Sequence, residues 1–454
     1  MDKGGEKMAT DKNGNYIKGT KKELPEGWVT YGFRFAIFPA EEDRKVLERS
    51  FGCERKVYNE YVAALYEHLE KIGFQGGFIQ YKTPNYTTIT QKYDFLDKSN
   101  DSFVYNDAKI RFQAAVKKYN DEFAKKPMQY KKAVRKKMRT AGYVPTLRDM
   151  KGLPKFHSKK QGKFSYTTNQ TNGNIKIVQR NAQSLLCIPK FRNGIPIAMH
   201  RELPKEAIIK KATIKREGDR YMVSLSVDFP MKQEPLRSNI EEDEVLALDY
   251  SQTNLYVDSE GCKAGYPRYH KIIEKRQRRL NKSLARKRNR ALVDSEDRIL
   301  YSTTYQNTLK NYQKTMAKAK NQRKDFLHKR SNQITNDYAA IVVEDLDLSN
   351  LAQCLSLGKK LHDNGFGMFR TMLEYKAKKK GKHLIFADTF FPSTKLCSEC
   401  NSKKETVKLS ERVYVCEHCR TKMDRDYNAA KNLKQYGIKI LSDLGFMAGV
   451  PVPV

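Results

Sequence analysis

The spacing of hydrophobic residues predicts helices in the first part of the chain. From Val46 to Leu69, apolar residues recur every three or four positions, and this helical spacing continues to about Ala141. A predicted strand, Tyr31–Phe38, precedes these helices, and Pro39 is suited to open the first of them.

The middle of the chain has a different pattern, with short β-rich stretches separated by Gly, Asn and Pro. The predicted strands are Phe164–Thr168, Ile175–Val178, Ile195–His200, Ala212–Arg216 and Tyr221–Val227. Regular short strands with turn signals are typical of a small antiparallel barrel or sandwich. Because one strand precedes the helices, we expect the helical block to be inserted into a β domain.

From about Glu244, predicted strands alternate with helices. Val245–Asp249 and Ala339–Glu344 are apolar runs that each end on a carboxylate, and a long basic helical region extends to about Tyr338 between them. The remaining predicted elements are a hairpin strand Leu255–Asp258, a helix Phe369–Lys379, a strand His383–Thr389 and a helix from Tyr427. This alternation predicts a mixed α/β sheet.

Charge indicates the kind of partner. The 454 residues include 87 Lys and Arg against 52 Asp and Glu, so the net charge is 87 − 52 = +35. Such an excess repels itself unless a polyanion neutralises it, and nucleic acid is favoured over an anionic membrane. The basic helices Lys117–Lys137 and Lys271–Arg290 are the candidate contact surfaces, although a basic helix is also compatible with a merely solvated face.

The sequence has no run of eighteen apolar residues and no apolar signal core near its N-terminus. We therefore expect a soluble, cytoplasmic protein that associates with the nucleoid when bound to DNA. We also find no helix-turn-helix or finger array that would read a long DNA site directly.

Four of the eight cysteines form a compact motif. Cys397 and Cys400 are followed, after fifteen residues, by Cys416 and Cys419. This is the two-knuckle spacing of a four-thiolate zinc site, and its alternative is a pair of local disulfides in a secreted protein. A closed four-thiolate site has no open position for catalysis, so the predicted zinc is structural.

Three carboxylates are candidates for a catalytic metal site. Asp249 and Glu344 end apolar strands, and Asp426 opens the segment Asp426-Tyr-Asn428-Ala-Ala. Converging carboxylates form an all-oxygen site suited to Mg²⁺ or Mn²⁺, and two such ions promote phosphodiester hydrolysis. Taken alone, Asp249 and Glu344 are equally compatible with a helix cap or a surface ion pair, whereas Asp426, which precedes a helix, is more often an N-cap.

These carboxylate segments resemble the three motifs of a RuvC nuclease domain, in the version found in TnpB, the RNA-guided nuclease of insertion sequences, and in miniature type V CRISPR effectors. The similar segments are Leu248-Asp249 through Asn254-Leu255, Val342-Val-Glu344-Asp-Leu346 and Asp426-Tyr-Asn428-Ala-Ala, with Pro392-Ser-Thr-Lys-Leu-Cys397 introducing the cysteines. The resemblance extends from about Tyr31 to Asn432, and the amino half, including Phe51-Gly-Cys-Glu-Arg-Lys-Val-Tyr-Asn59, favours TnpB over the CRISPR effectors. One position departs from the family pattern, since Ser251 stands where glycine is frequent.

The resemblance implies a multidomain α+β fold. The implied domains are a flexible tail (1–26), a β-barrel wedge domain (27–45 and 142–240), an inserted helical recognition domain (46–141), a RuvC domain of RNase H type (241–392 and 422–454) and an inserted zinc ribbon (393–421).

It also implies an RNA-guided endonuclease that cuts double-stranded DNA beside a short adjacent motif. Asp249, Glu344 and Asp426 would hold the catalytic Mg²⁺ or Mn²⁺, with Asp424 as the alternative to Asp426. The implied partners are guide RNA and target DNA. The alternatives are a CRISPR effector, a catalytically inactive RNA-guided regulator, and a structural zinc-ribbon protein with incidental carboxylates.

Overall fold

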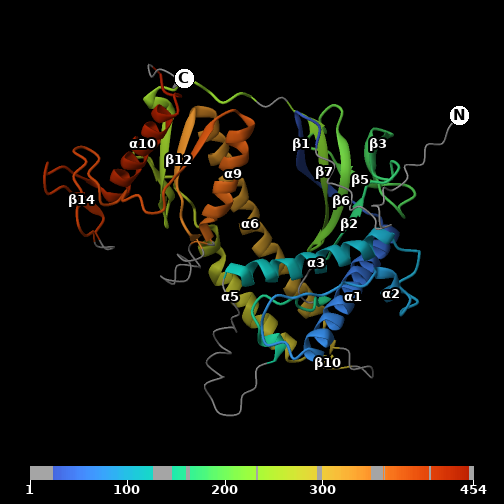
Figure 1. Ribbon diagram of the computed structural model, residues 1–454. Helices are drawn as coiled ribbons and strands as arrows, with labels where there is room; N and C mark the ends of the chain where they lie inside the picture. Colours follow the sequence, from blue (N-terminus) through green and yellow to red (C-terminus); the bar gives the residue numbers. More distant parts are fainter. Residues whose placement is uncertain are drawn as a thin grey trace, which may run out of the picture. The chain divides into compact units, whose positions relative to one another are not determined.

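The computed structural model describes residues 24–125, 146–159, 164–231, 234–293, 299–348, 361, 363–407 and 411–448 (Figure 1). The chain divides into two units, Met1–Met231 and Lys232–Val454, and each is a mixture of helices and strands. Figure 1 shows the long helices and the sheet of each unit, which are described below one unit at a time.

The first unit is built on a curled antiparallel sheet of seven strands in the order β2-β6-β7-β1-β5-β4-β3. The strands are β1 (Trp28–Ile37), β2 (Ser165–Asn169), β3 (Lys176–Arg180), β4 (Gln183–Cys187), β5 (Ile195–Ala198), β6 (Ile208–Glu217) and β7 (Arg220–Pro230). The predicted barrel is thus an open sheet in the described residues, with β2 and β3 as its edges. The predictions missed β4, whose sequence begins with two polar residues.

In the described residues, the helices of this unit are α1 (Glu41–Lys71), α2 (Tyr86–Thr90) and α3 (Ser102–Lys125), with a short helix Leu147–Asp149. All three α-helices lie in sequence between β1 and β2, two strands of the same sheet, as predicted for an inserted helical block. Their apolar faces join the sheet in one core, in which Phe51 of α1 lies 6.0 Å from the ring of Tyr166 on β2. The basic segment 126–137 lies outside the described residues.

The second unit contains a four-stranded sheet in the order β13-β12-β8-β9. The strands are β8 (Val245–Ser251), β9 (Leu255–Asp258), β12 (Ala340–Glu344) and β13 (His383–Ala387). The β8–β9 pairing is antiparallel, whereas β8–β12 and β12–β13 are parallel, so the predicted mixed sheet is present.

Helices cover both faces of this sheet. Leu246 and Leu248 of β8 pack in one cluster with α6 (Thr303–Asp337) and α9 (Phe366–Lys379). Val245 and Ala247 point to the opposite face and pack with α10 (Arg425–Asp443). A strand buried on both faces must be apolar at successive positions, which explains the continuous apolar run that ends at Asp249.

The helical region expected to extend to about Tyr338 is present but interrupted, because it consists of two helices. α5 (Tyr269–Arg288) and α6 are separated by the short strands β10 (Leu292–Val293) and β11 (Ile299–Leu300). Ser302 begins α6 by accepting a hydrogen bond from the backbone N–H of Tyr305 at 3.2 Å, which is N-capping.

Candidate metal centres

Two of the predicted catalytic carboxylates lie on neighbouring parallel strands. Val343 of β12 is paired with Leu248 of β8, so the next residues along the two strands are Glu344 and Asp249. Side chains at neighbouring positions of parallel strands point to the same face of the sheet. The two carboxylates therefore lie side by side on one face of the sheet. Asp249 is only 6% exposed and Glu344 is partly buried.

The third carboxylate stands at the amino end of α10. The N-cap of this helix is Asp424, whose Oδ1 accepts the backbone N–H groups of Asp426 at 2.9 Å and Tyr427 at 3.3 Å. Asp424 Oδ2 also lies 3.3 Å from the Lys263 ammonium. Asp426 therefore does not cap the helix, and its carboxylate lies 3.5 Å from the Arg425 guanidinium.

The three carboxylates lie close enough to influence one another's ionisation, as the pKa of Asp249 indicates. Burial raises the pKa of Asp249 well above its ordinary value, and the negative charges of Glu344 and then Asp426 raise it further. Burial also raises the pKa of Glu344. A group of acids in such a place ionises together only when a cation offsets the desolvation and the mutual repulsion. Carboxylate oxygens are the ligands that suit a hard divalent cation such as Mg²⁺.

The spacing of the carboxylates differs from that of a closed single-ion site. In the described part of the chain, the four ribbon cysteines are the only group of three or more Cys, His, Asp or Glu residues whose ligand atoms all lie within 4.8 Å of one another. The three carboxylates do not form a group of this kind.

The asparagines of the third motif have a role that the sequence analysis did not identify. Asn428 is fully buried, donates to the Leu396 carbonyl at 2.6 Å and accepts the Ser398 N–H at 2.9 Å. Asn432 donates to the carbonyls of Ser393 and Leu396 at 2.7 and 2.8 Å. The helix that carries Asp426 is thereby fastened to the segment that leads into the cysteine motif.

The small residues of the same motif lie on the buried side of α10. Ala429 and Ala430 are fully buried, and α10 packs on the face of the sheet that carries Ala247 and Val342. Ser251, at the position where glycine is frequent, is an ordinary strand residue paired with Leu255. Its hydroxyl accepts the Asn254 N–H at 3.4 Å, so the hairpin accommodates the serine.

The four predicted zinc ligands come together in the ribbon formed by β14 (Val413–Val415) and β15 (Lys422–Asp424). The Sγ atoms of Cys397 and Cys419 are 3.6 Å apart, as are those of Cys400 and Cys416. Zn–S bonds of about 2.3 Å in a tetrahedron place sulfurs roughly 3.8 Å apart, so the four thiols fit zinc. All four are free thiols, which excludes the disulfide alternative in this structure.

The thiols of this cluster differ in acidity. The Ser402 hydroxyl lowers the pKa of Cys400 to about 5 and that of Cys416 to about 7. Burial raises the pKa of Cys397 to about 12. A bound cation is therefore needed for the thiolate form of Cys397, and metal binding must release protons.

The basic helix α5 is the best-described candidate surface for a polyanion. None of its residues is buried, and its last turn carries Arg286, Lys287 and Arg288. Ten Lys and Arg against one acidic residue lie between positions 271 and 290. Phosphate contacts require such a density of cations. Within the described residues, no helix combines the length and apolar character needed to cross a bilayer.

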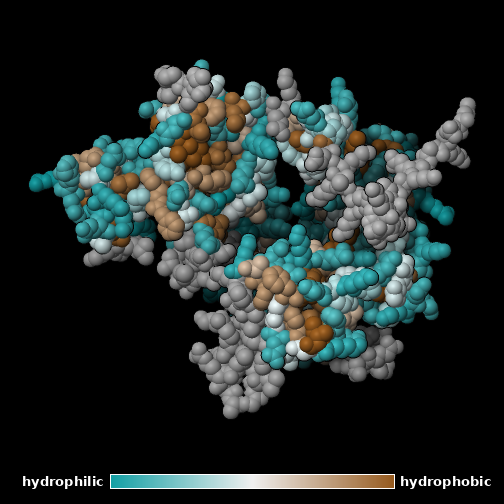
Figure 2. All heavy atoms as spheres, in the orientation of Figure 1, coloured by the Kyte–Doolittle hydropathy of each residue, from teal (hydrophilic) through white to brown (hydrophobic). Residues whose placement is uncertain are grey.

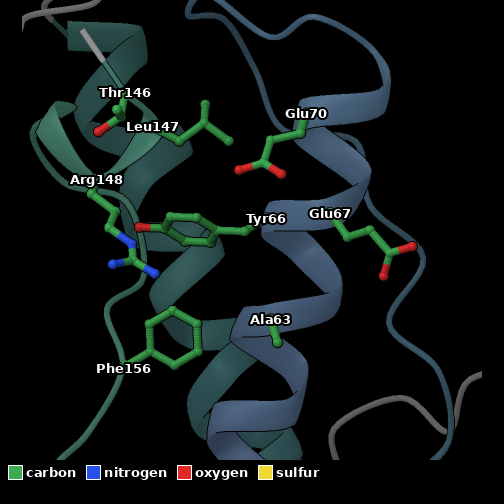
Figure 3. A pocket seen from close by; sticks show the side chains of 8 residues that line it. All are labelled: Ala63, Tyr66, Glu67, Glu70, Thr146, Leu147, Arg148 and Phe156. Carbon is green, nitrogen blue, oxygen red and sulfur yellow. The ribbon is translucent and has the colours of Figure 1, made fainter.

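A pocket of about 450 Å³ in the first unit belongs to neither metal centre (Figure 3). Its lining residues are Ala63, Tyr66, Glu67, Glu70, Thr146, Leu147, Arg148 and Phe156. Figure 3 shows Arg148 beside the rings of Tyr66 and Phe156, with the Glu67 carboxylate directed away from them. The two glutamates make the pocket unsuitable for a phosphate group.

Three family models match the chain. A model described as "Probable transposase" covers residues 228–355, a "Cas12f1-like, TNB domain" covers 366–433, and a "Helix-turn-helix domain" covers 29–71. The last description does not correspond to what is seen, because residues 29–71 form β1 and the single helix α1. The sequence analysis found no helix-turn-helix, and the name of this model says otherwise. In this segment the structure has one strand and one helix and therefore no helix-turn-helix.

Two relatives match most of this chain, and a third matches about a quarter of it. A protein of Streptomyces pristinaespiralis named "Putative RNA-guided DNA endonuclease" is 25% identical over 90% of both chains. A protein of Mycobacterium tuberculosis with the same description is 24% identical over 91% of this chain and 88% of its own. A "TnpB-like protein" of Acanthamoeba polyphaga mimivirus is 30% identical over 26% of this chain and 24% of its own. Together with the family models, these relatives identify the class, because the chain is similar to the TnpB family of insertion-sequence proteins.

Solved structures with a related arrangement include a "Cas12f1-sgRNA-target DNA complex", at 15% identity and a TM-score of 0.44, covering 90% of this chain and 99% of that one. A "mini-RNA-guided endonuclease CRISPR-Cas_phi3" is 10% identical with a TM-score of 0.43, covering 94% of both chains.

Proposed function

We propose that this protein is an RNA-guided endonuclease that hydrolyses double-stranded DNA beside a short adjacent motif. The observation that supports it most is the placement of Asp249 beside Glu344 by the β8–β12 pairing, with Asp426 close enough to raise the pKa of Asp249. The relatives that cover most of the chain are described as RNA-guided DNA endonucleases.

The domain assignment follows from the resemblance and from the order of elements. The curled sheet of the first unit serves as the wedge domain, with α1–α3 as the inserted recognition domain. The four-stranded sheet and α10 form the RuvC domain, and the cysteine ribbon is inserted before α10. The boundaries are those given for the sequence: 27–45 with 142–240, 46–141, 241–392 with 422–454, and 393–421.

In this proposal the carboxylates of Asp249, Glu344 and Asp426 hold the catalytic cations. Mg²⁺ or Mn²⁺ ions supply activation of a water and neutralisation of the charge that develops on the leaving oxygen. Asp249 is held in the low-dielectric interior of the sheet, where its charge acts strongly on a nearby cation. Asp424 keeps Asp426 available for binding, because it takes over the capping of α10.

The excess of +35 charges serves to hold nucleic acid by its phosphates. An RNA-guided enzyme leaves the reading of sequence to base pairing and grips the heteroduplex through its backbone. The ribbon is the structural zinc site, and α5 is the candidate surface for the duplex.

The deciding experiment changes the guide. The ribonucleoprotein is programmed with either of two guide segments and is given two plasmids, each of which carries one matching target beside the adjacent motif. We expect each guide to direct Mg²⁺-dependent cutting of its own plasmid only. If RNase-treated protein still cuts one plasmid at a defined position, the protein reads DNA itself and the proposal is wrong.

A further inference from the structure

Phe390 is the most exposed large hydrophobic side chain in the described part of the chain. It is 90% exposed, whereas the next, Leu292, is 72% exposed. A single exposed apolar residue is common on protein surfaces and means nothing by itself. The way this ring is held, and the place where it is held, distinguish it from the others.

A hydrogen-bonded turn fixes the backbone at Phe390. Asp388 Oδ1 accepts the Phe390 N–H at 2.7 Å, and the Asp388 carbonyl accepts the Phe391 N–H at 3.0 Å. Phe391 turns inward, where its ring lies 4.8 Å from that of Tyr436 on α10. Phe390 therefore points into solvent from a turn whose next residue is anchored in the core.

The turn lies at the edge of the sheet that carries the proposed catalytic carboxylates. β13 ends at Ala387, which is paired with Glu344 of β12. The hydroxyl of Thr389 donates to the Asp345 carbonyl at 3.1 Å, and the Asp345 N–H donates to the Ala387 carbonyl at 3.2 Å. The residue next to Phe390 is thus hydrogen-bonded to the residue next to Glu344.

The segment after the turn is also immobilised. The Ser393 N–H donates to the Phe391 carbonyl at 2.8 Å, and the Ser393 carbonyl accepts the side chain of Asn432 from α10 at 2.7 Å. In Figure 2 hydrophobic residues gather over α10 and the neighbouring sheet, whereas the ribbon is mostly hydrophilic. An apolar ring that is fastened in this turn and left in solvent has the properties of a stacking platform.

We propose that Phe390 stacks on a nucleobase of the single DNA strand that enters the site, next to the scissile phosphate. The inference rests on the proposed function and adds a substrate contact to it. An aromatic ring stacks on any base because every base has a π-face, and a phenyl group has no hydrogen-bonding atom with which to choose among bases. Phe390 therefore positions the strand without adding sequence preference.

Fluorescence tests this contact without cleavage. The only tryptophan of the chain is Trp28, so Trp28→Phe combined with Phe390→Trp gives a single reporter at the turn. The full-length protein, freed of copurifying nucleic acid and without added Mg²⁺, is titrated with a single-stranded oligodeoxynucleotide and with an abasic strand of the same length. Both strands carry the same phosphates, and one of them lacks bases.

We expect strong quenching by the strand with bases and little by the abasic strand, with binding of both strands confirmed by anisotropy of an end label. Equal emission changes with both strands, or none with either, would overturn the inference. This result does not depend on guided cleavage, so the inference and the proposed function fail or survive separately.

Cleavage by the guided complex gives the second readout. Loss of one base–aromatic stack is worth about 1–3 kcal/mol, so Phe390→Ala is expected to slow cutting about 5- to 150-fold, with Phe390→Tyr close to the wild type. Phe38→Ala is the matched control, because it removes the same ring from another exposed position, 60% exposed. An abasic residue at the stacked position should slow the wild type and leave Phe390→Ala unchanged; additive losses at every position would contradict stacking.

Discussion

The carboxylate of Asp424 accepts the backbone N–H of Asp426 at 2.9 Å, so two acidic residues at one helix end have different tasks. The N-cap satisfies the free amides of α10, and its loss costs about 1 kcal/mol. The neighbour at the first turn is then available for a metal. The arrangement favours Asp426 over Asp424 as the third proposed ligand.

Substitutions at these two positions test that division. Asp426→Ala should abolish cleavage while guided DNA binding remains, because the proposed role of this carboxylate is to hold metal. Asp424→Ala should lower the melting temperature slightly and reduce cleavage by no more than about tenfold, and Asp424→Asn, which keeps a capping side chain, should be close to the wild type. Single-turnover rates and thermal melts measure both effects. If Asp424→Asn is inactive and Asp426→Ala cuts, the ligand assignment is wrong.

Gly437 sets how closely α10 approaches the sheet. A Cβ atom added there would overlap Val342 Cγ2 on β12, and a β-branched strand residue has little freedom to move away. We expect Gly437→Ala to lower the free energy of unfolding by about 1–3 kcal/mol and to reduce cleavage by displacing Asp426. Chemical denaturation and cleavage rates measure the two effects.

The chain offers a matched control for this substitution. Gly52 lies inside α1, and the nearest atom to an added Cβ there is Arg55 Nη2 at 3.9 Å. Gly52→Ala should therefore stabilise the protein by up to about 1 kcal/mol through helix propensity alone. Adding Val342→Ala to Gly437→Ala should restore part of the lost activity by making space. No recovery in the double variant would count against the close packing described here.

Local patterns predicted the elements that carry the proposed active site. β9 has the predicted bounds, and the apolar runs that end at Asp249 and Glu344 are the strands β8 and β12. The cysteine spacing predicted the four-thiol cluster, because a metal site with short spacings is a local property. The break between α5 and α6, where the short strands β10 and β11 lie, was missed, because a basic and polar helical composition is present on both sides of it.

Features that depend on pairing between distant segments did not follow from the sequence. The proximity of Asp249 and Glu344 depends on the parallel register of β8 and β12. In the sequence analysis, only the resemblance to a family indicated that these two residues act at one site. The opposite orientations of Phe390 and Phe391 depend on the turn after β13 and on the contact of Phe391 with Tyr436 of α10. The division between Asp424 and Asp426 depends on where α10 begins.

The zinc ribbon should lose its structure when one thiol is removed. Its buried cluster consists of Cys397, Tyr414 and Cys416, with Cys400 packed against them, so little besides metal stabilises it. Elemental analysis should find about one zinc per chain, and Cys397→Ser should lose the metal and become sensitive to protease within 393–421. Cys262→Ser, at an exposed free thiol outside the motif, is the control and should retain zinc. Four alkylatable ribbon thiols in the native, metal-free protein would contradict the site.

Asp249 should destabilise the metal-free protein at neutral pH. Its pKa in the folded protein is raised by burial and by Glu344, so the folded state holds this proton more tightly than the unfolded chain, in which the pKa is about 3.9. Stability is therefore lost as pH rises from about 4 through the raised pKa, because the unfolded chain releases the proton first. Asp249→Asn carries no such proton and should melt at a higher temperature than the wild type at neutral pH, with the difference shrinking toward pH 4.

Added Mg²⁺ should raise the melting temperature of the wild type much more than that of Asp249→Asn, since binding to the folded state stabilises it. Melting curves across this pH range, with and without Mg²⁺, measure all of these differences, and a wild type that is more stable than Asp249→Asn without metal at neutral pH would refute the buried, repelling carboxylate.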